Sequence, residues 1–377
     1  MNRSWKNRVI VMLVIFAAIL LLPLLDSSQA AAEAQWHPTG SLNIPRSYHE
    51  ATLLADGRVL VTGGFDLNGR SLTSAEMYDP VAGTWQTTGD MTAPRAYHTA
   101  TLLHDAKVLV VGGFDSGTQT IYASAELYDP ASGTWTPTGS LDIGRYLHAA
   151  TLLETGLVLA IAGSSENIVY LQECELYNPA TGAWSPTGLL KTGVWSQTTN
   201  LLPNGSVLEA GGEGGRFGGS YGGAEVYNPA LGTWSSLRHM ASRHSGHTAT
   251  LLGSGEVLVA GGTDGAAVNT ICELYDPSTH SWSLTGRLND ARQLHTATQL
   301  RSGRVLVAGG TNGTGALASG ETYDPRSGEW EFTGSLHVAR YAHTATRLKD
   351  GTVLVAGGYS SDFSKLDSAE LYIPPKR

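Results

Sequence analysis

The amino-acid sequence predicts an all-β protein built from seven similar four-stranded sheets, and three recurring anchors carry this prediction. A Trp, a Gly-Gly doublet after an apolar run, and a Glu-x-Tyr triplet each occur seven times in 377 residues, with one doublet varied to Ala-Gly. The repeat length of 48 to 50 residues is typical of a repeat architecture. The tryptophans are Trp36, Trp85, Trp135, Trp184, Trp234, Trp282 and Trp330, and the triplets begin at Glu76, Glu126, Glu175, Glu225, Glu273, Glu321 and Glu370.

Each repeat contains four short strands in a fixed order. The first is the string ATLL, which ends at a turn such as Asp56-Gly57, and the second is VLVTGG or VLVAGG. The third is SAELYDP with an Asp-Pro-x-x-Gly turn, and the fourth is TWxxTG. Turn signals separate the apolar runs, and no helical period persists beyond the N-terminal segment. A four-stranded antiparallel sheet repeated at this length predicts the blade of a β-propeller.

The order of the anchors predicts how the ring closes. Trp36 has no triplet before it, and the triplet at Glu370 has no Trp after it. We therefore expect the strand around Trp36 to complete the last blade as its fourth, outer strand. The result is a seven-bladed β-propeller without the free strand edges of a linear array. Removal of residues 35–42 should then destabilise the whole ring.

On the strength of these motifs, residues 35–377 resemble the Kelch repeat. The doublet, the downstream Tyr and the following Trp carry the resemblance, and seven matched units make it specific. The resemblance implies a Kelch β-propeller of the kind also seen in the central domain of galactose oxidase.

Residues 1–30 are typical of an export signal. Three basic residues precede an uncharged apolar run over residues 9–25, and the small-residue string SSQAAAEA follows. Cleavage after Ala30, Ala32 or Ala34 would release a secreted, extracytoplasmic propeller. The run is 17 residues long, near the lower limit for a spanning helix, so an uncleaved anchor at the cell surface is the alternative.

The charge pattern argues against anionic partners. The formal net charge is −9, and the basic residues are scattered along the chain. We expect no nucleic-acid partner and a monomeric protein.

The spacing between anchors varies in one place only. The distance from doublet to triplet ranges from 12 to 14 residues, whereas the other spacings are constant. The loop between the second and third strands is therefore the variable one, and binding commonly uses such loops on a rigid frame. The resemblance to Kelch propellers also implies this face. Candidate binding residues in these loops are Phe65, Asp66, Phe114, Asp115, Arg216, Phe217, Tyr221 and Tyr359. The alternative is that these aromatics only pack between blades.

A histidine recurs in the first strand of six repeats, in strings such as RAYHTATLL. Its apolar neighbours favour a structural role over a metal site, which needs three or four converging ligands. We interpret this His, the Glu of the triplet and an Arg three residues before the His as one buried network, because a buried carboxylate is costly unless paired. The members beside the seven Glu are Arg46, Arg95, Arg145, Arg292, Arg340, His49, His98, His148, His247, His295 and His343.

Repeat four departs from the pattern. It has Val194 and Gln197 in place of the Arg and His, and Trp195 stands between them. Such a departure marks either a functional site or drift. If a small-ligand site exists, the residues to consider first are Trp195, Arg216 and Tyr221.

The two cysteines, Cys174 and Cys272, occupy identical positions two repeats apart, too far for a disulfide. The resemblance to galactose oxidase implies a copper site with a Cys cross-linked to a Tyr, and because neither Cys lies in a variable loop, we do not expect that copper chemistry. We predict no catalytic residue, metal or cofactor. The leading interpretation is an exported binding or scaffold protein for a protein or glycan partner, and the alternative is an extracellular carbohydrate-active or galactose-oxidase-like enzyme module.

Overall fold

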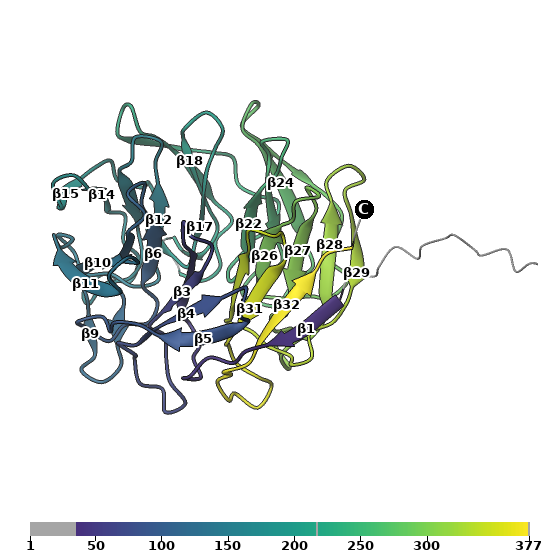
Figure 1. Cartoon of the computed structure of the whole chain (residues 1–377). Coiled ribbons are helices and arrows are strands. Elements are labelled where there is room, and N and C mark those ends of the chain that lie inside the picture. The colour runs from purple at the N-terminus through teal and green to yellow at the C-terminus, as the bar shows by residue number, and fades with distance from the viewer. Residues whose placement is uncertain (1–34, 216–217, 376–377) are drawn as a thin grey trace, which may run out of the picture.

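The computed structural model describes residues 35–215 and 218–375, which form seven four-stranded antiparallel sheets arranged as a ring (Figure 1). No helix occurs in these two ranges. The predicted all-β, seven-bladed propeller is therefore confirmed.

The blades follow one another along the chain, and the first-named strand of each blade is its innermost one. Blades one and two are β2 (Glu50–Leu53), β3 (Val59–Thr62), β4 (Ala75–Asp79) and β5 (Thr84–Thr87), then β6 (Thr99–Leu102), β7 (Val108–Val111), β10 (Ala125–Asp129) and β11 (Thr134–Thr138). Blades three and four are β12 (Ala149–Leu152), β13 (Val158–Ile161), β14 (Cys174–Asn178) and β15 (Ala183–Pro186), then β17 (Thr198–Leu201), β18 (Val207–Ala210), β20 (Ala224–Asn228) and β21 (Thr233–Ser236). Blades five and six are β22 (Thr248–Leu251), β23 (Val257–Ala260), β24 (Cys272–Asp276) and β25 (Ser281–Leu284), then β26 (Thr296–Gln299), β27 (Val305–Ala308), β28 (Gly320–Asp324) and β29 (Glu329–Thr333). Blade seven is β30 (Thr344–Arg347), β31 (Val353–Ala356), β32 (Ala369–Ile373) and β1 (Gln35–Thr39). Two short antiparallel pairs lie outside the blades, the hairpin of β8 (Phe114–Asp115) with β9 (Thr120–Ile121), and the pair of β16 (Val194–Trp195) with β19 (Glu213–Gly214), which flanks β17 and β18 in the chain.

The second strand of each blade is buried along its whole length, because both faces of a blade are covered by neighbours. In β3, Val59 and Val61 pack into the cluster shared with blade seven, whereas Leu60 packs into the cluster shared with blade two. Side chains alternate between the two faces of a strand, so a Val-rich run fills two cores at once.

The recurring Trp ties its blade to the preceding one. Trp85 lies opposite Tyr78 across the β4–β5 pair, with ring centroids 5.0 Å apart. Its indole Nε1 donates a 2.8 Å hydrogen bond to the carbonyl of Gly40, just after β1. A Cβ on Gly40 would meet the carbonyl oxygen of Gly83 at 2.4 Å, so this close approach of two backbones requires glycine.

The N-terminal strand closes the ring. β1 pairs antiparallel with β32, with Trp36 opposite Tyr372, and Figure 1 shows the purple β1 beside the yellow β32. Trp36 Nε1 donates to the carbonyl of Gly334 in the preceding blade at 2.7 Å. The outer strand of blade seven is thus supplied by the start of the described chain.

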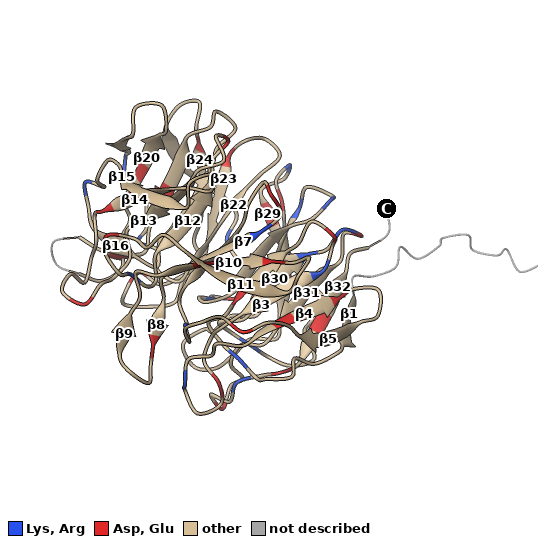
Figure 2. Ribbon diagram, turned by 60° about the vertical axis from the view of Figure 1, so that its left-hand side comes forward, with Lys and Arg blue, Asp and Glu red and all other residues tan. Residues whose placement is uncertain are grey.

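Charged residues are dispersed around the ring. In Figure 2, the ribbon positions of Lys and Arg are interspersed with those of Asp and Glu over blades and loops. The expected export signal at residues 1–30 lies outside the described residues. Within residues 35–215 and 218–375, no helix has the length and apolar character needed to cross a membrane.

Candidate functional site

A buried arginine pairs with the Glu of the triplet in five blades. In blade one, Arg46 Nη2 donates to Glu76 Oε1 at 2.7 Å, while Nη1 donates to the carbonyls of Gly63 and Ser74. Both side chains are fully buried. The remaining pairs, with N–O distances of 2.7 to 3.0 Å, are Arg95–Glu126, Arg145–Glu175, Arg292–Glu321 and Arg340–Glu370.

Backbone amides complete the coordination of each carboxylate. Glu76 accepts hydrogen bonds from the amides of Asn43 and Ile44 at 2.7 and 3.1 Å. These amides precede the first strand, so Glu76 ties the third strand to the segment that enters its blade. The Arg46–Glu76 pair is thereby a structural clamp with its donors and acceptors satisfied.

Blade five uses a histidine as the clamp. His244 occupies the position of the Arg, and its Nε2 lies 3.2 Å from Glu273 Oε1 while Nδ1 lies 2.7 Å from the carbonyl of Gly261. The hydrogen bond from His244 and the amides of Ala241 and Ser242 outweigh burial and lower the pKa of Glu273. Sequence reasoning missed His244 because the string there is RHSGHTATLL, whose Arg stands one position earlier.

The repeated histidines contact threonines instead of the Glu, unlike the single Glu–Arg–His network expected. His49 Nε2 lies 3.0 Å from Thr344 Oγ1 in the first strand of the preceding blade. His148, His247, His295 and His343 make the same contact with Thr99, Thr198, Thr248 and Thr296. Burial lowers the pKa of the six rings, to about 3 for His98 and His247, so they are neutral at pH 7. Five of the six contact the first strand of the preceding blade, whereas His98 contacts Thr62 at the end of β3.

Seven aromatic side chains form one continuous cluster on the variable-loop face, and we call this cluster the aromatic arc. Its members are Tyr341 and Tyr359 of blade seven, Tyr48 and Phe65 of blade one, Tyr97 and Phe114 of blade two, and Tyr146 of blade three. Successive ring centroids lie 4.5 to 6.3 Å apart, the range of favourable aromatic pairs. All seven side chains are partly exposed.

The backbone just before the repeated His forms a ring of hydrogen bonds around the axis, with one step, from Ser196 to Gly246, that lacks this bond. The amide of Tyr97 donates to the carbonyl of Tyr48, and the amide of Leu147 donates to the carbonyl of Tyr97. Tyr48 and Tyr97 have φ of 51° and 55°, a left-handed conformation that is unfavourable for bulky residues. The ring imposes this conformation, which sets both tyrosines at the mouth of the central channel.

The loop-face end of the channel is a cavity of about 450 Å³. Tyr48 and Tyr97 line it together with the histidines, the threonines and one acid, Glu50. Burial raises the pKa of Glu50 to about 8. The cavity and the aromatic arc therefore share two tyrosines and form one surface.

The predicted binding residues other than Trp195 and Tyr221 fall into three groups. Phe65, Phe114 and Tyr359 lie in the aromatic arc. Asp66 and Asp115 instead accept backbone amides of their own loops, so they shape turns. Arg216 and Phe217 lie outside the described residues.

Repeat four places Trp195 and Tyr221 in different surroundings. Trp195 lies opposite Glu213 in the antiparallel β16–β19 pair. Tyr221 lines a separate cavity of about 380 Å³ between blades four and five, and its hydroxyl donates to Thr192 Oγ1 at 3.1 Å. The structure therefore does not gather these two residues into one pocket.

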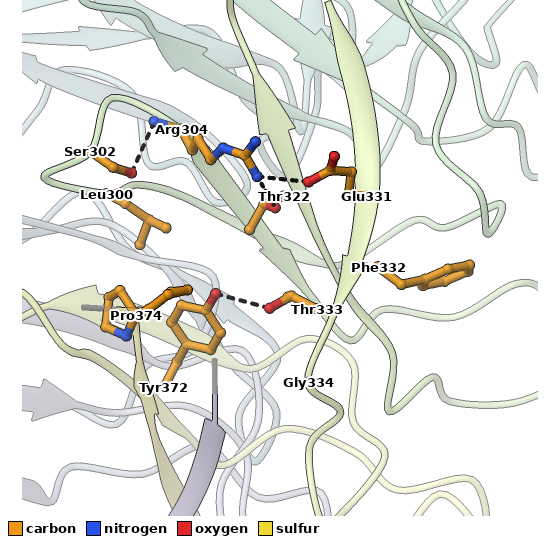
Figure 3. Close-up of a pocket in the computed structure, with 11 residues that line it drawn as sticks. Leu300, Ser302, Arg304, Thr322, Glu331, Phe332, Thr333, Gly334, Tyr372 and Pro374 are labelled. Atoms are coloured by element: carbon orange, nitrogen blue, oxygen red, sulfur yellow. Dashed lines mark hydrogen bonds and ion pairs between the residues drawn. The ribbon is translucent and has the colours of Figure 1, made fainter. Parts of the chain in front are cut away.

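A larger cavity of about 620 Å³ lies between blades six and seven, away from the aromatic arc (Figure 3). Its polar groups are paired among themselves, since Arg304 contacts Asp324, Glu331 and Thr322, and the Tyr372 hydroxyl lies 3.0 Å from Thr333 Oγ1. This leaves few free donors or acceptors for a ligand.

A copper site does not fit the described residues. No group of three or more His, Cys, Asp or Glu in residues 35–215 and 218–375 could hold a metal ion. Cys174 and Cys272 are buried in third strands, where burial raises the pKa of each thiol to about 12. Their donor atoms are directed into cores rather than toward the channel.

Comparisons with known proteins agree with this architecture. A sequence profile of the Kelch motif matches residues 45–92, 94–141 and 301–337. The solved structure of a fungal alcohol oxidase of the AA5 family, in complex with copper, aligns with a TM-score of 0.73 over 91% of this chain and 76% of that one. Its sequence identity of 18% shows likeness of fold alone. Comparison with curated proteins finds no match.

The chain is thus a seven-bladed β-propeller, the class that the ring of blades defines. More narrowly, three stretches of the chain match the Kelch motif, and its fold is similar to that of the fungal AA5 alcohol oxidase.

Sequence reasoning missed four members of the aromatic arc, Tyr48, Tyr97, Tyr146 and Tyr341. They stand one or two positions before the His, inside the string RAYHTATLL and its counterparts. That string predicts an inner strand, whereas the strand begins only after the His. The signal that could have identified these residues is that the two positions before the His vary among the repeats.

Proposed function

We propose that this chain is an exported, non-enzymatic Kelch propeller that binds a protein or glycan partner through the aromatic arc. The arc is the observation that carries the proposal. Blades seven, one, two and three contribute aromatics to it, whereas blades five and six have Ser245, Gly246, Gln293 and Leu294 at the matching positions before the His. The binding face is therefore asymmetric despite the repeated frame.

Partly exposed, mutually packed rings suit stacking against sugar faces or apolar side chains. Aromatic residues, especially Tyr, are enriched where one side chain must offer apolar area and a polar tip. The phenol groups of the arc can donate and accept hydrogen bonds at the rim. Since each ring packs on its neighbours, little side-chain entropy is lost on binding.

The enzyme alternative has less support. Glycoside hydrolysis usually needs two carboxylates on opposite sides of the bond. The lining of the channel cavity contains Glu50 as its single acid. The residues in the described ranges also lack the donor set for copper chemistry.

Substitution of arc residues away from the channel tests the proposal. In the double variant Phe114→Ala/Tyr341→Ala, partner binding on glycan arrays or to extracellular proteins should weaken by at least tenfold. The matched control is Phe332→Ala on the outer strand of blade six, where the ring is 59% exposed. Equal binding by the double variant and the wild-type chain would contradict the role of the arc.

Export is a separate part of the proposal. It rests on the basic, apolar and small-residue order of residues 1–30. N-terminal sequencing of protein recovered outside the producing cells should begin after Ala30, Ala32 or Ala34. Retention of residues 9–25 in a membrane fraction would support the anchor instead.

A further inference from the structure

Glu50 breaks the pattern of the channel wall. It is the first residue of β2, and the matching residue is Thr in five of the other six first strands and Ala149 in the third blade. Each of those threonines contacts a His of the next blade. Because Glu50 stands in its place, His98 turns to Thr62 Oγ1 at 2.8 Å.

The Glu50 carboxylate has no partner of its own in the described parts of the chain. It lines the channel cavity, and no hydrogen bond or ion pair joins its side chain to another described residue. The other titratable groups in the lining are the six histidines and the two tyrosines of the mouth. The lining contains no Lys, no Arg and no second acid. The histidines are neutral, so the cavity supplies no cation to this carboxylate.

We propose that the loop-face end of the channel binds an organic ammonium group, with Glu50 as its counter-charge and Tyr48 and Tyr97 as aromatic contacts. The tyrosine rings, with centroids 4.5 Å apart, line the same cavity as the acid. Aromatic faces attract cations, and most strongly where water is excluded. The proposal rests on the proposed function in one respect, that the ligand enters from the face of the aromatic arc.

The chemistry of the cavity favours an organic cation over a metal ion. Calcium takes six to eight oxygen ligands and magnesium keeps a hydrated octahedron, whereas one carboxylate is available in this cavity. An ammonium group needs one counter-charge and an apolar, aromatic surround. A cavity of about 450 Å³ has room for a small ligand of this class.

Ligand binding should also displace a proton. Burial raises the pKa of Glu50 to about 8, so the free carboxyl is mostly protonated at pH 7. A cation beside it favours the ionised form, and the proton passes to the buffer. Binding should therefore tighten as pH rises from 6 to 9, and close to one proton should leave for each ligand bound at pH 7.

Calorimetric titration of the whole chain with choline chloride tests the proposal. Saturable binding is expected, and comparison of two buffers with different ionisation enthalpies should show the released proton. The neutral isostere 3,3-dimethyl-1-butanol should bind at least tenfold more weakly. Equal binding of the two probes would overturn the inference, as would binding without proton release.

Two variants separate the role of Glu50 from general damage. Glu50→Thr restores the residue of the other repeats, and Glu50→Gln keeps the shape without the charge. Both should fold and should weaken choline binding at least tenfold, and wild-type affinity in either would overturn the proposal. Methylammonium chloride and calcium chloride serve as further probes, since tighter binding of calcium than of either ammonium ion would also overturn it.

Failure of the ammonium site can be distinguished from failure of the aromatic arc as the partner-binding surface. The variant Phe114→Ala/Tyr341→Ala leaves the lining of the channel unchanged and should keep choline affinity. If it loses partner binding while no choline binds to the wild type, the ammonium site fails and the arc stands. If choline binds through Glu50 while arc variants keep their partner, the arc fails and the ammonium site stands.

Discussion

Glu209 lies directly across from Glu225 in the β18–β20 pair, and no arginine of the described chain is paired with either carboxylate. In the other blades, the residue opposite the triplet Glu is Val or Ala. Val194 replaces the Arg of this blade, and Glu225 keeps only the amides of Lys191 and Thr192 as partners. Blade four therefore buries two acids where five other blades bury an Arg–Glu ion pair.

Replacement of Glu209 by Val should stabilise the protein at neutral pH. Burial, and then the neighbouring Glu225, raise the pKa of Glu209 well above its usual value, and Oε1 has no hydrogen-bond partner. A buried polar group without a partner costs about 1–3 kcal/mol. Urea unfolding at pH 8 should show a gain of this order for Glu209→Val. The control Glu154→Gln, in an exposed turn, should change stability by less than about 0.5 kcal/mol.

The same pair predicts a pH dependence. An acid whose pKa is higher in the folded state binds more protons folded than unfolded, so stability falls as pH rises. The loss begins near the unfolded pKa, about 4.3, and continues through the raised folded pKa of Glu209. Over this window the melting temperature of the wild-type chain should fall relative to that of the Glu209→Val variant, because the six buried histidines, whose pKa values are lowered, contribute equally to both proteins. Parallel profiles would contradict the assignment.

Removal of one partner from a buried clamp should be costly. Arg95→Met leaves Glu126 buried without its counter-charge, which typically costs about 3–5 kcal/mol. The double variant Arg95→Met/Glu126→Gln removes both charges and should recover part of the loss, because no isolated carboxylate remains. A double-mutant cycle by urea unfolding measures this coupling. Additive losses would show that the two side chains act independently.

The sequence predicted the ring and its closure because the signals for them are local and repeated. Trp85 packs on Tyr78 in blade one, and the matching Trp and Tyr pack together in every other blade. The aromatic arc was harder to predict from the sequence, because backbone hydrogen bonds between blades bring Tyr48 and Tyr97 together. The spacing of motifs along the chain does not show which residues, among those that differ between repeats, lie close together around the axis.

The acids of repeat-breaking positions were also missed for a physical reason. Glu50 stands at a position that is Thr in most other first strands, and Glu209 stands in a second strand that is otherwise Val-rich. A comparison that looks for residues shared by the repeats does not detect such exceptions. Their significance depends on burial and on the lack of a counter-charge, which are properties of the assembled ring. Val194 is a visible departure because it replaces an Arg that recurs, whereas Glu209 becomes notable only once β18 is placed beside Glu225.

The closing strand should stabilise the whole ring. Trp36→Ala removes a buried ring that packs 5.1 Å from Tyr372 and the hydrogen bond to Gly334. Truncation of a buried Trp costs about 3–5 kcal/mol. We expect near-ultraviolet circular dichroism and intrinsic fluorescence to report one common, lower melting temperature. A local change confined to blade seven, with the other blades melting as before, would contradict the closure argument. Leu284→Ala, at an exposed outer-strand position, is the control.

The strained backbone ring at the channel mouth gives a last prediction. One blade has a glycine at the strained position and serves as the reference for the others. Ala342 has φ of 50°, and the matching residue in blade five is Gly246 with φ of 62°. A left-handed conformation costs an L-residue about 1–2 kcal/mol, whereas glycine adopts it freely. Gly246→Ala should therefore destabilise the protein by about this amount, because its added Cβ meets only ordinary contacts at 3.5 Å or more and strain is the main cost. Ala342→Gly should be neutral or stabilising despite the flexibility of glycine. Urea unfolding of both variants decides the matter, and a destabilised Ala342→Gly with an unaffected Gly246→Ala would show that the mouth is not under strain.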